Sequence, residues 1–145
     1  MLKNLESLSL FSNAYLSGKI PPELGGLGRL KTLSLFFTNL SGNIPPELAR
    51  LSSLAIMDIY KNKLSGNIPK ELGHTKTMKR LYLWGNTLSR SIPKDLGELT
   101  SLENFTVCVN NLSGSIHEEL GNLSSLKYIY ISVNNLSGSI PRELG

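Results

Sequence analysis

Apolar residues recur along the chain at two spacings, a short one within segments and a long one between them. In segments such as 81–83 and 105–107, an apolar residue, a variable residue and a second apolar residue follow one another. This alternation is the period of a β-strand, in which successive side chains point to opposite faces of the sheet. The pattern therefore predicts short strands whose first and third residues point into a core.

The longer spacing is 24 residues, and it relates three separate columns of apolar residues. Self-similarity at a fixed period of this length predicts a repeat array, in which each unit buries its apolar side chains against its neighbours. Leu8 stands 25 residues before Leu33, so we expect one inserted residue at 14–15 and a wider first turn. The columns are Leu16, Leu40, Leu64, Leu88, Leu112 and Leu136; Ile20, Ile44, Ile68, Ile92, Ile116 and Ile140; and Leu24, Leu48, Leu72, Leu96, Leu120 and Leu144.

Turn-forming residues follow each predicted strand. In the segment Leu-Ser-Gly-x-Ile-Pro at 64–69, Gly66 suits unusual backbone angles and Pro69 excludes a central strand. Pro69 and Gly73 then favour the start and the end of a helix of only one or two turns. The sequence therefore predicts an α/β solenoid with one long parallel sheet, short 3₁₀ or α turns, and second short strands on the outer side.

Asparagine recurs three residues beyond the last inward residue of the predicted strand, where the chain turns and backbone amides lose their partners. A short amide side chain can satisfy these groups, so stacked copies are expected to form a hydrogen-bonded ladder. Thr38 keeps a polar side chain at the equivalent position of the second repeat. The predicted ladder consists of Asn62, Asn86, Asn110 and Asn134.

The repeat unit resembles the plant-specific class of leucine-rich repeats, which reads approximately LxxLxxLxLxxNxLSGxIPxxLGxL. Its Leu-Ser-Gly-x-Ile-Pro motif is intact at 16–21, 40–45, 64–69 and 136–141, and the resemblance covers essentially the whole chain. It implies a right-handed leucine-rich repeat superhelix with the parallel β-sheet on its concave face. Similar repeats occur in the ectodomains of plant leucine-rich repeat receptor-like kinases and receptor-like proteins, and in secreted polygalacturonase-inhibiting and ice-binding proteins. The fold is shared while the ligand differs.

The chain departs from this pattern at three positions, where Arg90 replaces glycine, His117 replaces proline and Thr75 replaces leucine. We therefore expect local irregularity around the fourth repeat. Residues 1–145 are interpreted as a single domain of six repeats of about 24 residues, the last one incomplete. The cysteine-paired caps of the family are not recognisable, which suggests an excised array with exposed apolar ends and end-to-end self-association. The leucines and isoleucine expected at the ends are Leu2, Leu5, Leu8, Leu136, Ile140 and Leu144.

Composition narrows the range of partners. The net charge is +4, but only 18% of the residues are charged, which does not favour nucleic-acid binding. No apolar stretch is long enough to span a membrane, so membrane attachment is expected only through a missing segment of a parent protein. Eight Lys or Arg residues lie between Lys61 and Lys94, against the single acidic residue Glu71. They could attract an anionic partner, but Lys70 and Lys76 are expected on outer loops, which favours a solvated surface.

The variable strand positions form columns on the concave face, and these columns offer a candidate binding site. One column reads Phe11, Phe36, Tyr60, Trp84, Cys108 and Ser132. Tyr, Trp and Arg dominate binding hot spots, so we expect a peptide groove along repeats two to four. The alternative is cross-strand aromatic packing that only stiffens the sheet. The expected contact residues are Phe36, Asp58, Tyr60, Lys61, Arg80, Tyr82, Trp84, Thr106, Tyr128 and Tyr130.

Five Asn-x-Ser/Thr sequons suit a secreted glycoprotein, although Asn-Leu-Ser is partly built into the repeat. A glycan on Asn104 would block one end of the expected groove. The glycosylation candidates are Asn39, Asn104, Asn111, Asn122 and Asn135.

Catalysis requires a nucleophile, a base and an orienting group that converge, and no such cluster is evident. The segment from His117 to Gly121 is superficially similar to an HExxH zinc motif, but Gly121 removes the second ligand. Cys108 has no histidine in a matching column. We therefore expect a non-enzyme without cofactor or metal; a serine/threonine kinase domain of a parent receptor would lie outside these residues.

The resemblance and the concave columns together indicate a non-enzymatic module that recognises a peptide or protein, with a co-receptor as a further expected partner. The chain would be a fragment of a plant receptor-like kinase ectodomain in signalling or defence, located outside the cell or at its surface. The alternative is a secreted repeat protein that binds a cell-wall polysaccharide, a pectin-degrading enzyme or ice. Ice binding favours a flat array of small hydroxyl residues, whereas the columns here are bulky and irregular.

Overall fold

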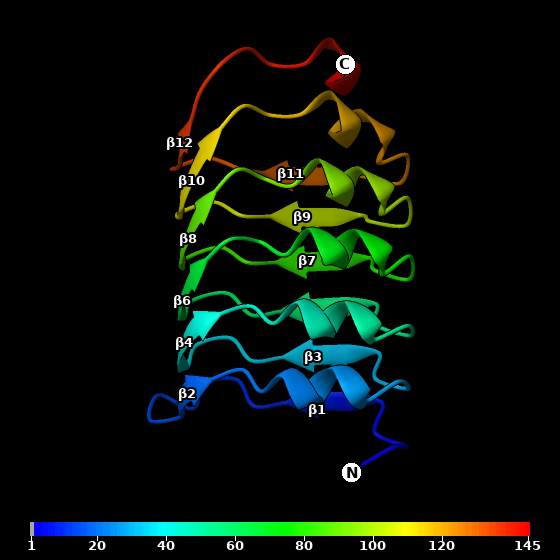
Figure 1. The fold of residues 1–145 in the computed structure, drawn as a ribbon, viewed down its shortest axis with the longest axis vertical. Helices are drawn as coiled ribbons and strands as arrows, with labels where there is room; N and C mark the ends of the chain where they lie inside the picture. Colours follow the sequence, from blue (N-terminus) through cyan, green and yellow to red (C-terminus); the bar gives the residue numbers. More distant parts are fainter. Residues whose placement is uncertain (1) are drawn as a thin grey trace.

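The computed structural model describes residues 2–145, which wind into a stack of six coils with the two termini at opposite ends (Figure 1). Each coil contains one inner strand of three residues. Adjacent inner strands are parallel and form a single sheet in the order β1-β3-β5-β7-β9-β11. These strands are β1 (Ser7–Ser9), β3 (Thr32–Ser34), β5 (Ile56–Asp58), β7 (Arg80–Tyr82), β9 (Asn104–Thr106) and β11 (Tyr128–Tyr130).

The remainder of each coil carries a second short strand and a 3₁₀ helix. The second strands form another parallel sheet in the order β12-β10-β8-β6-β4-β2. They are β2 (Ser17–Lys19), β4 (Asn39–Asn43), β6 (Lys63–Gly66), β8 (Thr87–Arg90), β10 (Asn111–Gly114) and β12 (Asn135–Leu136). The 3₁₀ helices are η1 (Pro22–Gly26), η2 (Pro46–Arg50), η3 (Lys70–His74), η4 (Lys94–Glu98), η5 (Glu118–Asn122) and η6 (Arg142–Leu144). The predicted solenoid, with a parallel sheet of inner strands, short 3₁₀ turns and second short strands, is confirmed, and the second strands also pair into a sheet of their own.

The register of the inner sheet follows the repeat of the sequence. Arg80 of β7 pairs with Asn104 of β9, one period further along the chain. Ser7 of β1 pairs with Thr32 of β3, which is one residue more than a period. The extra residue lies in the turn before β2, where Tyr15 is 99% exposed. The insertion therefore widens the first turn without shifting the strands.

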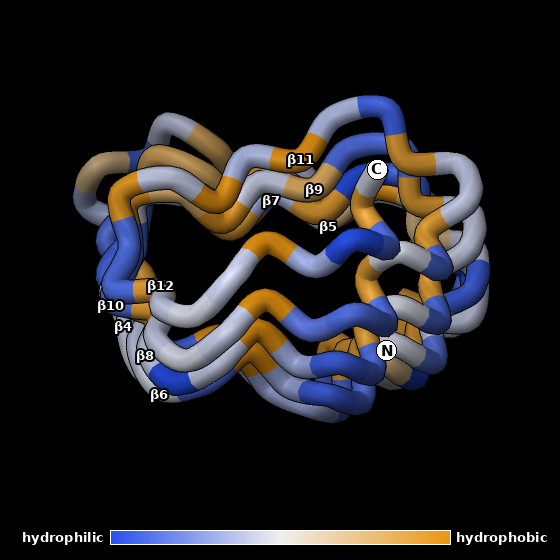
Figure 2. The backbone as a smooth tube through the Cα atoms, turned by 90° about the horizontal axis from the view of Figure 1, so that it is seen from above, coloured by the Kyte–Doolittle hydropathy of each residue, from blue (hydrophilic) through white to orange (hydrophobic). Residues whose placement is uncertain are grey.

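The apolar columns form one core cluster. In Figure 2, hydrophobic residues (orange) recur at the same places in successive coils. The core is closed in the middle coils and open at both ends, where Leu2 is 69% exposed and Ile140 is 80% exposed. No helix among residues 2–145 combines the length and the apolar character that crossing a membrane requires. Inward strand residues with no exposed surface include Leu33, Met57, Ile59, Leu81, Leu83, Phe105 and Val107.

The departures from the repeat pattern leave the backbone unchanged. Arg90 has a φ of 70°, close to the 77° of Gly66 one repeat earlier, and β8 keeps its place in the sheet. A residue with a Cβ atom costs about 1–2 kcal/mol in this left-handed conformation. His117 precedes η5 in the same extended conformation as the prolines before the other helices. The local irregularity expected in the fourth repeat is therefore not seen; the repeat accepts strain instead.

Candidate binding face

The turn that follows each inner strand is fixed by the asparagine ladder, Asn62, Asn86, Asn110 and Asn134. The Nδ2 group of Asn86 donates hydrogen bonds to the carbonyl oxygens of Leu83, at 3.0 Å, and Ile59, at 3.2 Å. Its Oδ1 atom accepts one from the amide of Leu64, at 3.0 Å. The other three asparagines make the same set of contacts. Each amide thus joins two coils at the edge of the concave face.

Aromatic side chains form a second column, the aromatic ladder, which consists of Phe11, Phe36, Tyr60 and Trp84. Consecutive ring centroids are 4.5, 4.5 and 4.8 Å apart, and the ring planes differ by 6°, 7° and 10°. These distances match the spacing of about 4.8 Å between neighbouring strands. The in-register sheet therefore stacks the rings face to face. The ladder ends after Trp84, because Cys108 and Ser132 occupy the next two positions.

Two residues with left-handed backbone angles flank the aromatic ladder. Phe37 and Lys61 each have a φ of 53°. The ring of Phe37 meets those of Phe36 and Tyr60 edge-on, at centroid distances of 6.0 and 5.8 Å. The ammonium group of Lys61 lies 5.1 Å from the ring of Trp84, within the range of a cation–π contact. The ladder is therefore flanked by the Phe37 ring beside Phe36 and Tyr60, and by the Lys61 ammonium group beside Trp84.

A carboxylate and a guanidinium lie beside the ladder, on strands β5 and β7. Arg80 Nη1 is 3.5 Å from Asp58 Oδ2, and Arg80 Cζ is 5.3 Å from the ring of Tyr82. Tyr82 in turn meets Tyr60 edge-on at 6.3 Å. Asp58 is only 7% exposed, and burial raises the pKa of its carboxyl group while Arg80 opposes the rise. Burial, followed by the charge of Asp58, also raises the pKa of Tyr60.

The structure brings most of the sequence-predicted contact residues into one surface. Phe36, Asp58, Tyr60, Lys61, Arg80, Tyr82 and Trp84 form a continuous set of contacts. Thr106 pairs in register with Tyr82, between the ladder and the last inner strand. Tyr128 and Tyr130 on β11 are each 54% exposed and lie apart from this set, because β9 separates them from β7.

Phe37 is a member of this surface that the sequence reasoning missed. It lies just outside the period-two pattern of the strand, and only its left-handed backbone turns its ring back onto Phe36. The place of Phe37 in the repeat could have indicated its conformation. The equivalent residues of the other repeats also have positive φ angles, namely Ser12, Lys61, Gly85, Val109 and Val133.

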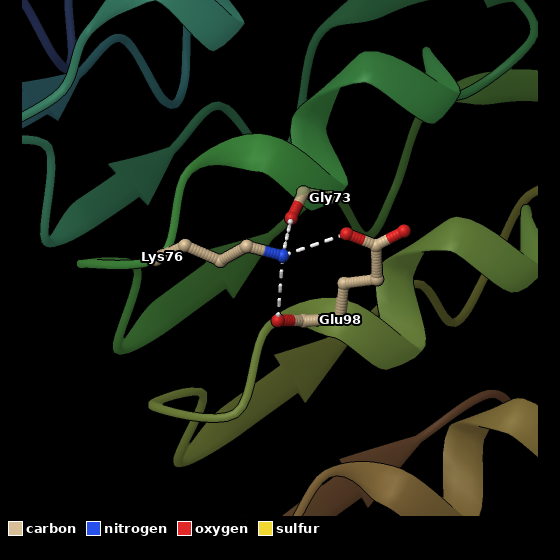
Figure 3. A network of polar contacts seen from close by, with 3 residues as sticks. All are labelled: Gly73, Lys76 and Glu98. Atoms are coloured by element: carbon tan, nitrogen blue, oxygen red, sulfur yellow. Dashed lines mark hydrogen bonds and ion pairs between the residues drawn. The ribbon is translucent and has the colours of Figure 1, made fainter.

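Two of the eight positive residues between Lys61 and Lys94 form ion pairs away from the concave face. Figure 3 shows Lys76, whose ammonium group contacts the carbonyl oxygens of Gly73 and Glu98 at 3.1 and 3.2 Å. It also binds the Glu98 carboxylate at 2.7 Å, and this hydrogen bond lowers the pKa of Glu98. Lys94 lies 3.8 Å from Glu119 of the next coil. Arg80 and Lys61 are the members of this cluster that contact the rings of the binding face.

The five sequons lie in different settings. Asn104 is on the concave strand β9 and is partly buried, and the partly buried Asn39 donates a hydrogen bond to the carbonyl oxygen of Ala14. The other three are exposed: Asn111, Asn122 and Asn135. Within residues 2–145, no group of three or more His, Cys, Asp or Glu side chains is placed to hold a metal ion.

A family model described as "Leucine-rich repeat region" matches residues 8–144. The chain belongs to the leucine-rich repeat family. No curated protein matches it. The leucine-rich repeat ectodomain of the Arabidopsis thaliana receptor kinase GASSHO1/SCHENGEN3, in complex with CASPARIAN STRIP INTEGRITY FACTOR 2, is 38% identical with a TM-score of 0.97. The match covers 99% of this chain and 17% of that chain.

Two further solved structures with this architecture are a receptor kinase and an ice-binding protein. The Arabidopsis receptor kinase HAESA, in complex with the peptide hormone IDA and the co-receptor SERK1, is 35% identical with a TM-score of 0.91 over 96% of this chain and 23% of that one. A plant ice-binding protein is 28% identical with a TM-score of 0.84 over 93% of this chain and 51% of that one. The predicted resemblance to plant leucine-rich repeat receptor ectodomains is confirmed. This leucine-rich repeat chain spans about a fifth of the receptor structures it resembles.

Proposed function

We propose that this leucine-rich repeat chain recognises an extended peptide through the aromatic ladder and the adjacent pair Asp58 and Arg80. The observation that carries the proposal is the continuity of this surface. Four stacked rings cross the inner sheet, and a guanidinium and a carboxylate lie directly beside them. Aromatic and arginine side chains of this kind supply most of the energy at binding hot spots.

The direction of the ladder suits a peptide that runs along the stack. The rings follow one another from coil to coil at 4.5 to 4.8 Å, so the ladder extends across four coils. An extended peptide advances about 3.3 Å per residue, so roughly four of its residues would lie over the ladder. Shorter molecules would contact only part of the surface.

Stacking also helps to separate a peptide from a polysaccharide. A sugar ring needs an open aromatic face to stack on, whereas Phe36 and Tyr60 each have a neighbouring ring on both faces. Their edges are what the ladder presents to a ligand. Ring edges can pack against the apolar side chains of a peptide, and the Arg80 guanidinium can donate to its carbonyl groups. The irregular bulk of these columns likewise does not favour ice.

The comparisons support the proposal. The HAESA structure is a complex with a peptide hormone and a co-receptor, and the GASSHO1/SCHENGEN3 structure is a complex with CASPARIAN STRIP INTEGRITY FACTOR 2. We infer that this chain is a non-enzymatic segment of the extracellular part of a plant receptor-like kinase or receptor-like protein. Its partners would be a peptide and a co-receptor, with signalling or defence as the role of the parent protein.

Selection from a display library of short random peptides tests the proposal. Peptides enriched on the wild-type chain are then measured against the triple variant Tyr60→Ala, Tyr82→Ala and Trp84→Ala. The matched control is the double variant Tyr128→Ala and Tyr130→Ala, which removes exposed tyrosines from the separate strand β11. We expect affinity to fall by more than about tenfold in the triple variant alone, since hot-spot truncations each cost about 1 kcal/mol or more. Equal losses in both variants, or none in either, would refute the ladder as the binding site.

A further inference from the structure

Asp58 differs from the other polar residues of the concave face, because it is buried without being fully paired. Among residues 2–145, Asp58 Oδ1 and Thr75 Oγ1 are the buried side-chain oxygen or nitrogen atoms that have no hydrogen-bond partner. Thr75 lies in the interior, where leucine stands in other repeats. Asp58 lies on the variable side of β5, in the middle of the binding face.

The surroundings of Asp58 explain why it is difficult to satisfy within the chain. Ser34 and Tyr82 are its register partners on the two neighbouring strands, and Tyr60 follows on its own coil. The charged and titratable groups that face it are Arg80, Tyr60 and Tyr82. Arg80 reaches only Oδ2, and at 3.5 Å this is a long contact for a charge-assisted hydrogen bond. Oδ1 is thus a strong acceptor held out of water with nothing to accept from.

Arg80 is free to act in two ways. Its side chain is 41% exposed, whereas the Asp58 side chain is 9% exposed. A guanidinium has five N–H donors, of which one is directed at Asp58. The remaining donors can bind a planar anion, and carboxylate is the anion whose geometry matches the guanidinium fork. Because Arg80 is the partly exposed neighbour that contacts Asp58, direct binding of a ligand to Asp58 requires the Arg80 side chain to turn aside.

We propose, as a refinement that rests on the peptide recognition proposed above, that Asp58 Oδ1 accepts a hydrogen bond from a hydroxyl or N–H group of the bound peptide while Arg80 binds a carboxylate of the same peptide. The ligand is therefore an acidic peptide in which a neutral hydrogen-bond donor lies next to a carboxylate. A positively charged donor on the ligand, such as a lysine ammonium group, suits the site less well, because Arg80 and Lys61 already place two cations on this face.

This arrangement satisfies both partners at once. A ligand carboxylate alone would leave Oδ1 unpaired and would be repelled by Asp58. A ligand donor alone would leave the outer donors of Arg80 to water. With both groups present, the buried acceptor gains its partner and the long contact between Asp58 and Arg80 is supplemented by two shorter ones.

The test combines changes in the protein with changes in the peptide. An acidic peptide selected on the wild-type chain is compared with analogues in which each hydroxyl or side-chain amide is replaced in turn by a methyl group. Both forms are measured on wild type, Asp58→Leu and Asp58→Asn, with Ser9→Leu as the matched control, because Ser9 is an exposed residue of the same column on β1. Cooperative melting of each variant shows that it is folded.

In wild type and in Ser9→Leu, removing the critical donor is expected to weaken binding by about 10- to 100-fold, as for a hydrogen bond to a charged group. In Asp58→Leu the two peptides should bind equally. Asp58→Asn keeps an acceptor oxygen without the charge, so its preference for the peptide with the donor should be intermediate between those of wild type and Asp58→Leu. This variant takes the place of Asp58→Leu if the leucine variant does not fold. If the peptide binds but no donor is preferred, or if the preference survives in Asp58→Leu, the role of Asp58 is refuted while peptide recognition stands.

Two further peptides distinguish a C-terminal carboxylate from a side-chain carboxylate of the ligand. Amidation of the C-terminus removes the terminal carboxylate, and replacement of Asp or Glu by Asn or Gln removes a side-chain carboxylate. One of these changes should weaken binding to wild type by about tenfold or more and have little effect on binding to Arg80→Gln. If neither does so, Arg80 does not bind a ligand carboxylate. If no library peptide binds the wild-type chain at all, the proposed function itself fails.

Discussion

The asparagine ladder and the aromatic ladder run side by side along the same stack, one residue per coil, yet they differ in what they tolerate. Each asparagine is bonded to backbone groups of two coils, and one short amide side chain must both donate and accept at fixed points. The aromatic rings contact mainly each other, and their column continues as Cys108 and Ser132 without any break in the sheet. A column bonded to the backbone therefore repeats, and a column that meets solvent is free to vary.

The largest expected effect comes from breaking the asparagine ladder. Asn86→Ala leaves the buried amide of Leu64 without its acceptor and removes one donor from each of the carbonyl oxygens of Leu83 and Ile59, which keep hydrogen bonds from Asn110 and Asn62. An unsatisfied buried amide costs about 1–3 kcal/mol and each lost hydrogen bond about 1 kcal/mol, so we expect a loss of about 3 kcal/mol in the free energy of unfolding. Urea denaturation measures it.

Asn67→Ala is the matched control, because Asn67 is exposed and bonds only to the adjacent carbonyl of Ile68. Its loss should stay within about 0.5 kcal/mol. Similar losses in the two variants would show that the ladder contributes no more than an ordinary surface asparagine.

A smaller loss is expected when the aromatic ladder is broken in the middle. Tyr60→Ala removes stacking on Phe36 and on Trp84 together with the edge contacts to Phe37 and Tyr82. Since a partly exposed aromatic pair contributes about 0.5 kcal/mol, the low end of the range for such pairs, we expect a loss of about 2 kcal/mol.

Phe11→Ala, at the end of the ladder, removes a single stacking contact and should lose about a quarter as much. Both variants are compared by urea denaturation. A loss as large as that of Asn86→Ala in either variant would mean that the rings hold the fold together, and the distinction between the two ladders would not stand.

A gain in stability is expected where a buried polar atom lacks a partner. Thr75 is 1% exposed and its hydroxyl is unbonded, so Thr75→Val should raise the free energy of unfolding by about 1 kcal/mol. Thr77→Val is the control, because the hydroxyl of Thr77 donates to the carbonyl of Leu54 at 2.8 Å. That control should not be stabilised. A loss of stability in Thr75→Val would show that the hydroxyl has a partner in solution.

The smallest effect expected concerns the pH dependence of stability, because Arg80 offsets part of the burial of Asp58. Burial raises the pKa of Asp58 in the folded chain above its ordinary value of 3.8. Between these two pKa values the folded state binds more protons than the unfolded state, so stability falls as pH rises through this window. Asp58→Asn removes the titration.

The difference in free energy of unfolding between Asp58→Asn and wild type should therefore shift in favour of the variant as pH rises from below 3.8. Denaturant titrations at a series of pH values measure this difference. A shift in favour of the wild type over the same range would mean that the interaction with Arg80 outweighs burial.

The repeat made the fold predictable from the sequence. Period-two segments such as 81–83 overlap the inner strands, here β7 (Arg80–Tyr82), and the alignment of the columns alone predicts that Tyr60 lies next to Trp84. These features depend only on register, which a strict period fixes. The same period placed the asparagines at the turns.

The remainder of the binding face depends on rotamers and on which neighbours cover a residue. Asp58 was expected on the concave face, but its burial follows from the particular side chains of Tyr60, Tyr82 and Arg80 around it. Phe37 joins the ladder only through its left-handed backbone. The irregularity expected from Arg90 is absent because neighbouring coils impose their backbone on it. Periodicity carries no information on such local choices.

Because each coil adds one ring to the aromatic ladder, the number of repeats sets the length of the ladder. Excising one period, residues 61–84, would join Tyr60 to Gly85 with the motif intact and remove Trp84, the last rung. The remaining platform would be shorter by the 4.8 Å that separates those two rings. Duplicating the same period would lengthen it by one rung. Ligand length could thus be adjusted by gain or loss of whole modules, without redesigning the interior.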